Sequence, residues 1–208
     1  MPYLLLTVGL FLFIFSVFML LLPSFTHFDF IAVEWLNQHR TTNLNIIAKI
    51  LSAIGGMPFV LFLTSLWCLH QAWYKQYMQV AFIGLGLIGS IVTVWLLKYL
   101  IARPRPPEMY QLVHSYGASF PSAHSTYAAA LGCLAIFLSL KHPEKRLIWI
   151  CACAWIILMG SSRVYLGVHF PSDVLAGWGI SLIWIALLYL VCVKFSKSKK
   201  LILDNNLT

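Results

Sequence analysis

Charged side chains are scarce in this sequence. Of its 208 residues, 10% are Asp, Glu, Lys or Arg, whereas 61% are hydrophobic, and the mean hydropathy is +0.85. Soluble domains carry about 25% charged residues, so this composition excludes an ordinary soluble enzyme or binding module. Apolar runs of about 20 residues are typical of helices that cross a bilayer. A transmembrane barrel is excluded because the runs do not alternate, and the sequence predicts an all-α integral membrane protein.

Acidic residues are the scarcer charged type. There are six Asp and Glu against fourteen Lys and Arg, which gives a formal net charge of +8. The basic residues lie mostly in short segments between apolar runs and in the C-terminal tail. In these places they report membrane topology rather than nucleic-acid binding. No nucleic-acid partner is therefore predicted.

Cysteine pairs at metal-binding spacing are also missing. All five cysteines fall inside apolar runs, and Cys151 and Cys153 have no second pair to complete a zinc site. Buried free thiols are therefore predicted. The N-terminus has neither a basic segment nor a small-residue cleavage site after its apolar run. We interpret this run as a retained first helix rather than a cleaved signal peptide.

The apolar segments predict a bundle of six transmembrane helices. We expect them at residues 3–22, 59–73, 78–101, 122–140, 147–161 and 174–193, and the second can begin before residue 59. A polar stretch, 24–45, separates the first two. Within it, residues 28–36 form an amphipathic segment suited to lie at the membrane interface.

Basic residues orient the bundle. With the N-terminus in the cytoplasm, eight Lys and Arg lie inside and six outside, in agreement with the positive-inside rule. Both termini are then cytoplasmic, and residues 194–208 form a basic cytoplasmic tail. The whole chain, 1–208, is predicted to be one membrane-embedded domain. The segments after the first, third and fifth helices all face outward.

The glycine pattern Gly84-Leu85-Gly86-Leu87-Ile88-Gly89 matches the fingerprint of dinucleotide-binding proteins. That fingerprint requires a preceding strand, whereas this one lies in the middle of an apolar helix. Small residues in such a helix allow close packing against a neighbour. We therefore interpret the pattern as a packing surface.

The densest polar interruption is the stretch 162–173, expected as a loop between the fifth and sixth helices. Arg163, His169 and Asp173 occur there within eleven residues. If a helix begins near Pro171, the Asp173 carboxylate can reach back to the His169 ring. Such a pairing fixes the tautomer and stabilises the charged ring of a histidine that acts as base or nucleophile. The alternative is a loop that merely carries polar residues.

Two further polar clusters are expected on the same, outward side of the membrane. Lys98 ends the third helix, and Arg103 and Arg105 follow it on the side that should be poor in cations. Cations gathered in one place suggest an anionic ligand. Ser122 can cap the fourth helix, whose unpaired first N–H groups can bind a phosphate, and His124 lies in the same turn.

Together the clusters contain the groups that phosphoryl transfer without a metal requires. These are cations for the phosphate oxygens, a nucleophile, and a proton donor for the leaving oxygen. The sequence has no cluster of carboxylates suited to hold magnesium, because Asp173 is committed to His169 and only Glu108 lies nearby. No metal and no cofactor are predicted.

The same residues carry a family resemblance. Three motifs, Lys98-x6-Arg105-Pro106, Pro121-Ser122-Ala123-His124 and Ser162-Arg163-x5-His169-x3-Asp173, resemble the three-part signature of the type-2 phosphatidic acid phosphatase family, which includes the vanadium haloperoxidases. The resemblance covers residues 98–173, and the segment from Asp29 to Gly56 also looks like the corresponding part of the family. Ala123 departs from it, because the family usually has glycine there. Its methyl group can narrow the phosphate pocket and change rate or substrate preference, while the backbone donor is kept.

The resemblance implies a role for each signature residue. His169 would be the nucleophile that forms a phosphohistidine, and Asp173 would orient it. His124 would protonate the leaving oxygen and then activate water. The phosphate oxygens would be held by Lys98, Arg105, Ser122, Arg163 and the backbone N–H of Ala123.

The resemblance also implies a substrate. Integral members with an outward site resemble bacterial phosphatidylglycerophosphatase B and undecaprenyl-diphosphate phosphatases, so we expect a lipid phosphate or diphosphate at the outer face of a bacterial inner membrane. Undecaprenyl diphosphate is the first choice. The bilayer and the lipid are the implied partners, with no obligatory protein partner. The outward loop contains Glu108, Tyr110 and His114. These residues either select the headgroup or lie on the loop surface without contacting the substrate.

Three alternatives stay open at this point. One is a lipid phosphotransferase of the same family that acts on lipid A. Another is a haloperoxidase, which the membrane helices argue against. The last is a lipid-binding or flipping protein without activity, which predicts the loss of His169, His124 or Arg163, although all three are present.

Overall fold

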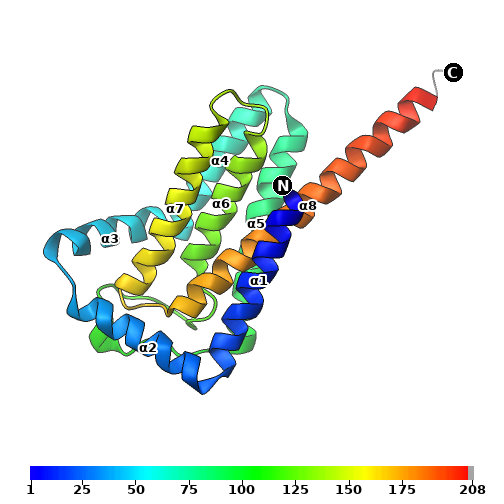
Figure 1. The fold of residues 1–208 in the computed structure, drawn as a ribbon. Helices are drawn as coiled ribbons and strands as arrows, with labels where there is room; N and C mark the ends of the chain where they lie inside the picture. The colour runs from blue at the N-terminus through cyan, green and yellow to red at the C-terminus, as the bar shows by residue number, and fades with distance from the viewer. Residues whose placement is uncertain (206–208) are drawn as a thin grey trace.

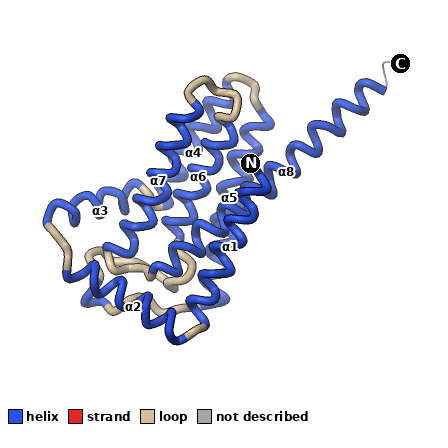
Figure 2. Tube along the Cα trace, viewed as in Figure 1, coloured by secondary structure: helices blue, strands red, loops and turns tan. Residues whose placement is uncertain are grey.

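The computed structural model describes the backbone of residues 1–205, and within them it forms helices, turns and loops but no strand (Figure 2). This confirms the predicted all-α fold class. The α-helices of this part are α1 (Pro2–Leu21), α2 (Pro23–Gln38), α3 (Thr42–Ile54), α4 (Met57–Trp73), α5 (Tyr77–Ile101), α6 (Ala123–Leu138), α7 (Lys145–Tyr165) and α8 (Pro171–Asn205). A 3-10 helix, η1, spans Glu108–Tyr110. Residues 206–208 and the side chains from residue 195 onward lie outside the description, and most of the predicted tail, 194–208, falls there.

Several helices have the length and apolar character of membrane spans. In the described residues these are α1, α5, α7 and α8 up to Lys194. The pair α3 and α4, bent by 55° at the break between them, gives a fifth candidate. α6 has 16 residues, or about 24 Å, which is less than the roughly 30 Å of a hydrocarbon core. The fold is thus that of a helical membrane protein with four to five candidate spans, and a total of six stays a prediction.

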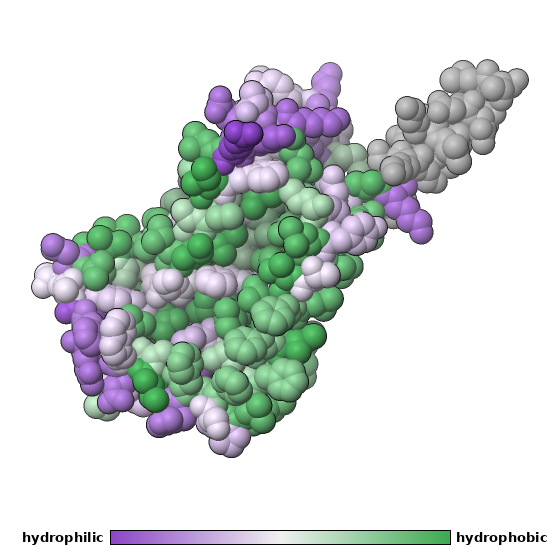
Figure 3. Space-filling model, in the orientation of Figure 1, coloured by the Kyte–Doolittle hydropathy of each residue, from purple (hydrophilic) through white to green (hydrophobic). Residues whose placement is uncertain are grey.

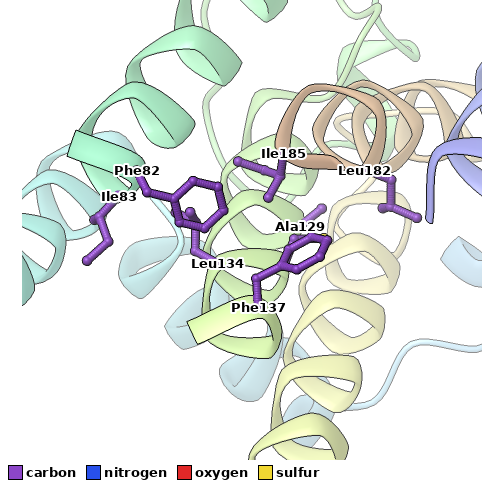
Figure 4. Packing of buried hydrophobic residues seen from close by; sticks show 8 residues of the cluster. Phe82, Ile83, Ala129, Leu134, Phe137, Leu182 and Ile185 are labelled. Carbon is purple, nitrogen blue, oxygen red and sulfur yellow. The ribbon is translucent and has the colours of Figure 1, made fainter. Parts of the chain in front are cut away.

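α6 runs through the centre of the bundle and packs against α5, α7 and α8 (Figure 1). Twelve of its 16 residues are buried. Figure 4 shows Phe82 of α5, Leu134 and Phe137 of α6, and Ile185 of α8 meeting in one cluster. Because protein rather than lipid surrounds α6, its short length fits its central position.

Two glycines of the fingerprint-like pattern allow α5 to approach α8 closely. A Cβ atom at Gly86 would lie 2.8 Å from Ile185, and one at Gly89 would lie 2.1 Å from the Trp184 ring. No side chain fits at such distances without movement of its neighbours. At Gly84 nothing lies within 4 Å. The interpretation as a packing surface is confirmed for Gly86 and Gly89.

The predicted boundaries of the last two helices are wrong. α7 continues to Tyr165 instead of ending at 161, and α8 begins at Pro171 instead of 174 and runs to Asn205 instead of 193. Polar residues at the end of α7 stay helical because they are inside the protein, where Arg163 is only 2% exposed. Proline is favoured in the first turn of a helix, so Pro171 starts α8 rather than preceding it. The expected loop 162–173 therefore shrinks to residues 166–170.

The polar stretch 24–45 is also more helical than predicted. It consists of α2 and the first turn of α3, and the amphipathic segment 28–36 lies within α2. Thr41 caps α3 by accepting a hydrogen bond from the N–H of Leu44. The second predicted helix, 59–73, is α4, which begins at Met57.

The polar segments gather at one end of the bundle. The loops 102–122 and 166–170 lie there together with α2 and α3, whereas the turns 74–76 and 139–144 lie at the other end (Figure 1). The N–H of Leu112 donates to Leu166 O, and that of Ser122 donates to Asp173 O. Hydrophobic side chains cover most of the flank in view, and hydrophilic ones concentrate towards its ends (Figure 3). The three segments predicted to face one side do share one end.

All five cysteines are free thiols, as predicted. Cys133 is buried in α6, but Cys151 and Cys153 are exposed on α7. Cys68 and Cys192 are half-buried. The prediction of burial is therefore confirmed for Cys133 only, and it is wrong for Cys151 and Cys153 because part of the surface of α7 faces away from the bundle.

Candidate active site

A cavity of about 290 Å³ lies where the polar segments meet. Six of the eight predicted site residues line it: Lys98, Arg105, Ala123, His124, Arg163 and His169. They come from α5, the loop 102–122, α6, α7 and the loop 166–170. The other two, Ser122 and Asp173, are fully buried, Ser122 at the N-terminus of α6 and Asp173 against the His169 ring.

His169 presents one ring nitrogen to the cavity. Its Nδ1 lies 3.3 Å from Asp173 Oδ2, and its Nε2 lies 3.2 Å from Nη1 of Arg105. A guanidinium only donates hydrogen bonds, so Nε2 accepts and Nδ1 carries the proton shared with Asp173. Burial lowers the pKa of His169 well below its ordinary value, although Asp173 acts in the opposite direction. The ring is therefore neutral at neutral pH, with a lone pair on Nε2.

The Asp173 carboxylate is held on several sides. Oδ2 accepts hydrogen bonds from Ser119 Oγ at 2.5 Å and from the N–H of Phe170 at 2.8 Å. Oδ1 accepts from Nη1 of Arg103 at 2.7 Å. The sequence interpretation committed Asp173 to His169 alone, and the structure corrects this. Asp173 lies in the first turn of α8, and these hydrogen bonds fix the position of its carboxylate. The carboxylate can therefore orient the His169 ring.

Arg103 does not line the cavity. It is buried behind it, where Nη2 lies 2.8 Å from Asp29 Oδ2 and Nη1 lies 2.7 Å from Asp173 Oδ1. The sequence interpretation grouped Arg103 with the cations gathered for an anionic ligand. That grouping is wrong for Arg103, because two carboxylates already engage its guanidinium.

Lys98 and Arg105 are anchored by backbone carbonyl groups. Lys98 Nζ donates to Ala118 O at 2.6 Å and to Ser119 O at 3.3 Å, and its side chain is 4% exposed. Arg105 donates to the carbonyl oxygens of Tyr116, Gly117 and Val168. These contacts orient both cations without neutralising their charge, so an anion in the cavity is attracted to both.

Arg163 enters from the last turn of α7. Its Nη1 donates to Ser52 Oγ, and its Nη2 lies 3.4 Å from Ser115 Oγ. Its Nε is buried and has no hydrogen-bond partner. A buried charged donor without a partner is costly, and an oxygen of a bound anion would satisfy it.

The N-terminus of α6 forms the remaining wall. Ser122 caps the helix as predicted, with Oγ accepting from the N–H of Ser125. Ala123 lines the cavity in the next position. His124 Nε2 lies 3.1 Å from Ser52 O, and since a carbonyl oxygen accepts, Nε2 carries the proton.

Some residues of the site have no role in the sequence prediction. Ser52 contacts both Arg163 and His124 from α3, and Ser119 contacts the Asp173 carboxylate. Ser119 stands three residues before Ser122 in the same polar run, which is a signal that could have found it. Ser52 lies in an apolar segment that carries no such signal. Of the three loop residues left open, His114 lines this cavity, whereas Glu108 and Tyr110 do not.

Comparison with known proteins identifies the family of this chain. A model of the PAP2 superfamily matches residues 79–197. Phosphatidylglycerophosphatase B of Bacillus subtilis (strain 168) is 32% identical over 160 residues, which cover 72% of this chain and 71% of that protein. Undecaprenyl-diphosphatase BcrC of the same strain is 27% identical over 158 residues, which cover 74% of this chain and 77% of that protein.

A solved structure shows the same fold. The crystal structure of a transmembrane PAP2-type phosphatidylglycerolphosphate phosphatase from Bacillus subtilis matches with a TM-score of 0.81 and 28% identity. The match covers 89% of this chain and 96% of that one. The family model, the relatives and the solved structure all lead to one assignment: the chain belongs to the PAP2 superfamily, a family with membrane lipid phosphatases among its members.

Proposed function

We propose that this protein hydrolyses a membrane lipid phosphate or diphosphate through a phosphohistidine on His169. The observation that carries the proposal is the convergence of two histidines and three cations, from five separate segments, on one cavity of about 290 Å³. A cavity of this size accommodates a phosphate group but not a whole lipid. Relatives named for phosphatidylglycerophosphate and undecaprenyl diphosphate support a lipid substrate.

In the first step, Nε2 of His169 attacks the phosphorus atom. A bond between nitrogen and phosphorus forms, and the bond from phosphorus to the lipid oxygen breaks. That oxygen takes the Nε2 proton of His124, which donates as the imidazolium and is left as the neutral imidazole. The geometry of the site supports these roles, because both histidines line the cavity, with a lone pair on Nε2 of His169 and a proton on Nε2 of His124. Asp173 stabilises the positive charge that the His169 ring gains.

In the second step, water attacks the phosphohistidine. His124, now without its proton, takes one from the water, the bond between nitrogen and phosphorus breaks, and inorganic phosphate leaves. Lys98, Arg105 and Arg163 hold the phosphate oxygens in both steps, with the unpaired Nε of Arg163 as one donor. The backbone N–H of Ala123 completes the cradle at the start of α6, and Ser122 holds that helix start in place by capping it.

The reaction is proposed to need no metal ion. Within the residues that the structure describes, no group of three or more His, Cys, Asp or Glu side chains is arranged to hold one. The charge that a metal would supply comes instead from the three cations. Activity in excess EDTA is the expected result, and a requirement for magnesium would contradict this part of the proposal.

We place the site at the outer face of a bacterial inner membrane. In this proposal six helices cross the bilayer, with α3 and α4 as one bent span and α6 shielded in the centre. The basic residues of the turns 74–76 and 139–144 then face the cytoplasm, as the positive-inside rule requires. The substrate would be a lipid of the outer leaflet.

A substrate panel tests the activity and its specificity. Purified protein in detergent is incubated with phosphatidate, phosphatidylglycerophosphate and undecaprenyl diphosphate, and phosphate release is measured with and without EDTA. We expect release from at least one lipid, with undecaprenyl diphosphate as the first candidate. Vanadate should inhibit, since it mimics five-coordinate phosphorus. No release from any lipid would contradict the proposal.

Replacement of Arg105 by alanine should mainly weaken substrate binding. A hydrogen bond to a charged group is worth about 1.5–3 kcal/mol, so KM is expected to rise roughly ten- to hundredfold. Initial rates at varied lipid concentration give this value. Arg105→Lys is the matched control, because it keeps the charge and should lose less. An unchanged KM in Arg105→Ala would remove Arg105 from the binding site.

A further inference from the structure

A second charge cluster lies behind the candidate active site, away from the cavity. Asp29 of α2, Arg103 of the loop after α5, and Ser172 and Asp173 of α8 meet there, and all four are buried. Arg103 bridges the two carboxylates at 2.8 and 2.7 Å, and the Ser172 hydroxyl contacts both Arg103 and Asp29. Asp29 also accepts the backbone N–H of Ser172 at 3.1 Å. The signature motifs of the sequence contain neither Asp29 nor Arg103 as a functional residue.

Within the cluster the two carboxylate oxygens of Asp173 have different partners. Arg103 occupies Oδ1, which leaves Oδ2 for Ser119, the N–H of Phe170 and the His169 ring. A carboxylate held in this way cannot rotate freely about its Cβ–Cγ bond. The orientation of the His169 ring therefore depends on Arg103, although Arg103 touches neither the ring nor the cavity.

The cluster also sets the charge next to His169. Arg103 alone would cancel the negative charge of Asp173, but Asp29 balances Arg103. Two carboxylates and one guanidinium leave one net negative charge beside the imidazole. At buried positions such a charge is weakly screened and acts strongly on a nearby ring. It is also the charge that favours a positively charged imidazole.

A purely structural role is a weak explanation for this arrangement. Buried ion pairs contribute little net stability compared with apolar residues of the same size. α2 is in any case fastened at its end, where Arg40 donates to Tyr110 O at 2.6 Å and to Tyr165 O at 2.8 Å. The buried charges are placed instead against the one carboxylate that contacts His169.

We propose that Asp29 and Arg103 are positioning residues for the reaction: they fix the Asp173 carboxylate and keep a net negative charge beside His169. The inference rests on the proposed phosphohistidine chemistry. It extends the catalytic unit from the loop 166–170 to α2, a helix outside the signature. It also predicts that a change on α2 alters the chemical step without altering lipid binding.

The test uses Asp29→Asn, which keeps the shape of the side chain and removes its charge. Purified full-length variants in detergent are compared by kcat per folded molecule, KM for a lipid phosphate, the inhibition constant of vanadate, and Tm. We expect kcat to fall about tenfold and the vanadate inhibition constant to rise about tenfold, the effect of one pKa unit of lost charge stabilisation. KM should stay within about twofold of wild type. Arg40→Gln is the matched control, because it loosens the same helix without reaching Asp173.

The outcomes separate the possible roles. A merely structural role changes Tm and the folded fraction, but it leaves kcat per folded molecule and the vanadate constant unchanged, and this would overturn the proposal. Equal changes in Arg40→Gln would overturn it too. If Asp29→Asn does not fold, Ser172→Ala removes only the bridging hydroxyl, and a shift of the same two constants is again required. A wild-type protein inactive on every lipid phosphate would instead contradict the proposed function.

Discussion

Replacement of His169 by alanine is expected to reduce lipid phosphate hydrolysis to the background rate. In the proposed mechanism both chemical steps run through Nε2 of this ring, so none of the other site residues can replace it. Removal of a nucleophile that acts as part of a unit costs roughly 10⁴-fold in kcat or more. The measurement is phosphate release by purified protein in detergent, normalised to folded protein.

The control for His169→Ala is His70→Ala. His70 lies in the last turn of α4, at the end of the bundle opposite the cavity, so wild-type activity is expected. The assignment of the nucleophile would be wrong if His169→Ala kept a rate within about tenfold of wild type. A simple loss of folding is detected by comparing the Tm of the two variants.

Replacement of His124 by alanine should have the next largest effect. A lipid monophosphate such as phosphatidate releases an alkoxide, a poor leaving group that needs a proton. With that substrate, loss of the donor is expected to lower kcat by about 10²–10⁴-fold. A nitrophenyl phosphate needs no such proton, because its leaving group is stable as an anion. With that substrate we expect a burst of nitrophenol equal to the amount of enzyme, followed by slow turnover, because His124 is still missing for water activation.

Rapid mixing and the nitrophenol absorbance measure this burst. Wild-type protein is the reference and should show no such separation of the two steps. Equal loss on both substrates, without a burst, would mean that His124 serves the site in a way other than proton transfer. The contact of His124 with Ser52 then becomes the feature to explain.

The residues that line the site were largely predictable from the sequence. Polar residues are costly in an apolar chain, so Lys98, His124, Arg163 and His169 stood out, and six of the eight predicted residues line one cavity. Their convergence followed from the topology, since three loops on one side of a small bundle are necessarily close. The roles of these residues stay predictions until they are tested.

The long-range partners were not predictable. Arg103 appeared to be one more cation near Arg105, but it is held by Asp29, which lies 74 residues earlier in the chain. Ser52 reaches Arg163 across 111 positions. Local sequence patterns report which residues are unusual, whereas such pairs depend on how α2 and α3 fold back against the bundle.

Helix ends were misjudged for a related reason. The sequence predicts that the membrane helix ends at residue 161 and that residues 162–165 belong to a loop, as they would if lipid surrounded them. They stay helical because the end of α7 is inside the protein, with Arg163 and Ser162 buried. The start of α8 at Pro171 carried a signal, the preference of proline for the first turn of a helix, and the prediction gave it too little weight.

The most direct test of the proposed mechanism is to trap the phosphorylated enzyme. Protein is mixed with a radiolabelled lipid phosphate, quenched in base within milliseconds, and analysed by peptide mapping. The mechanism predicts phosphate that is stable in base, labile in acid, and located on His169, with none in His169→Ala. Phosphate on another residue, or turnover with inversion at phosphorus and no phosphorylated enzyme, would contradict it.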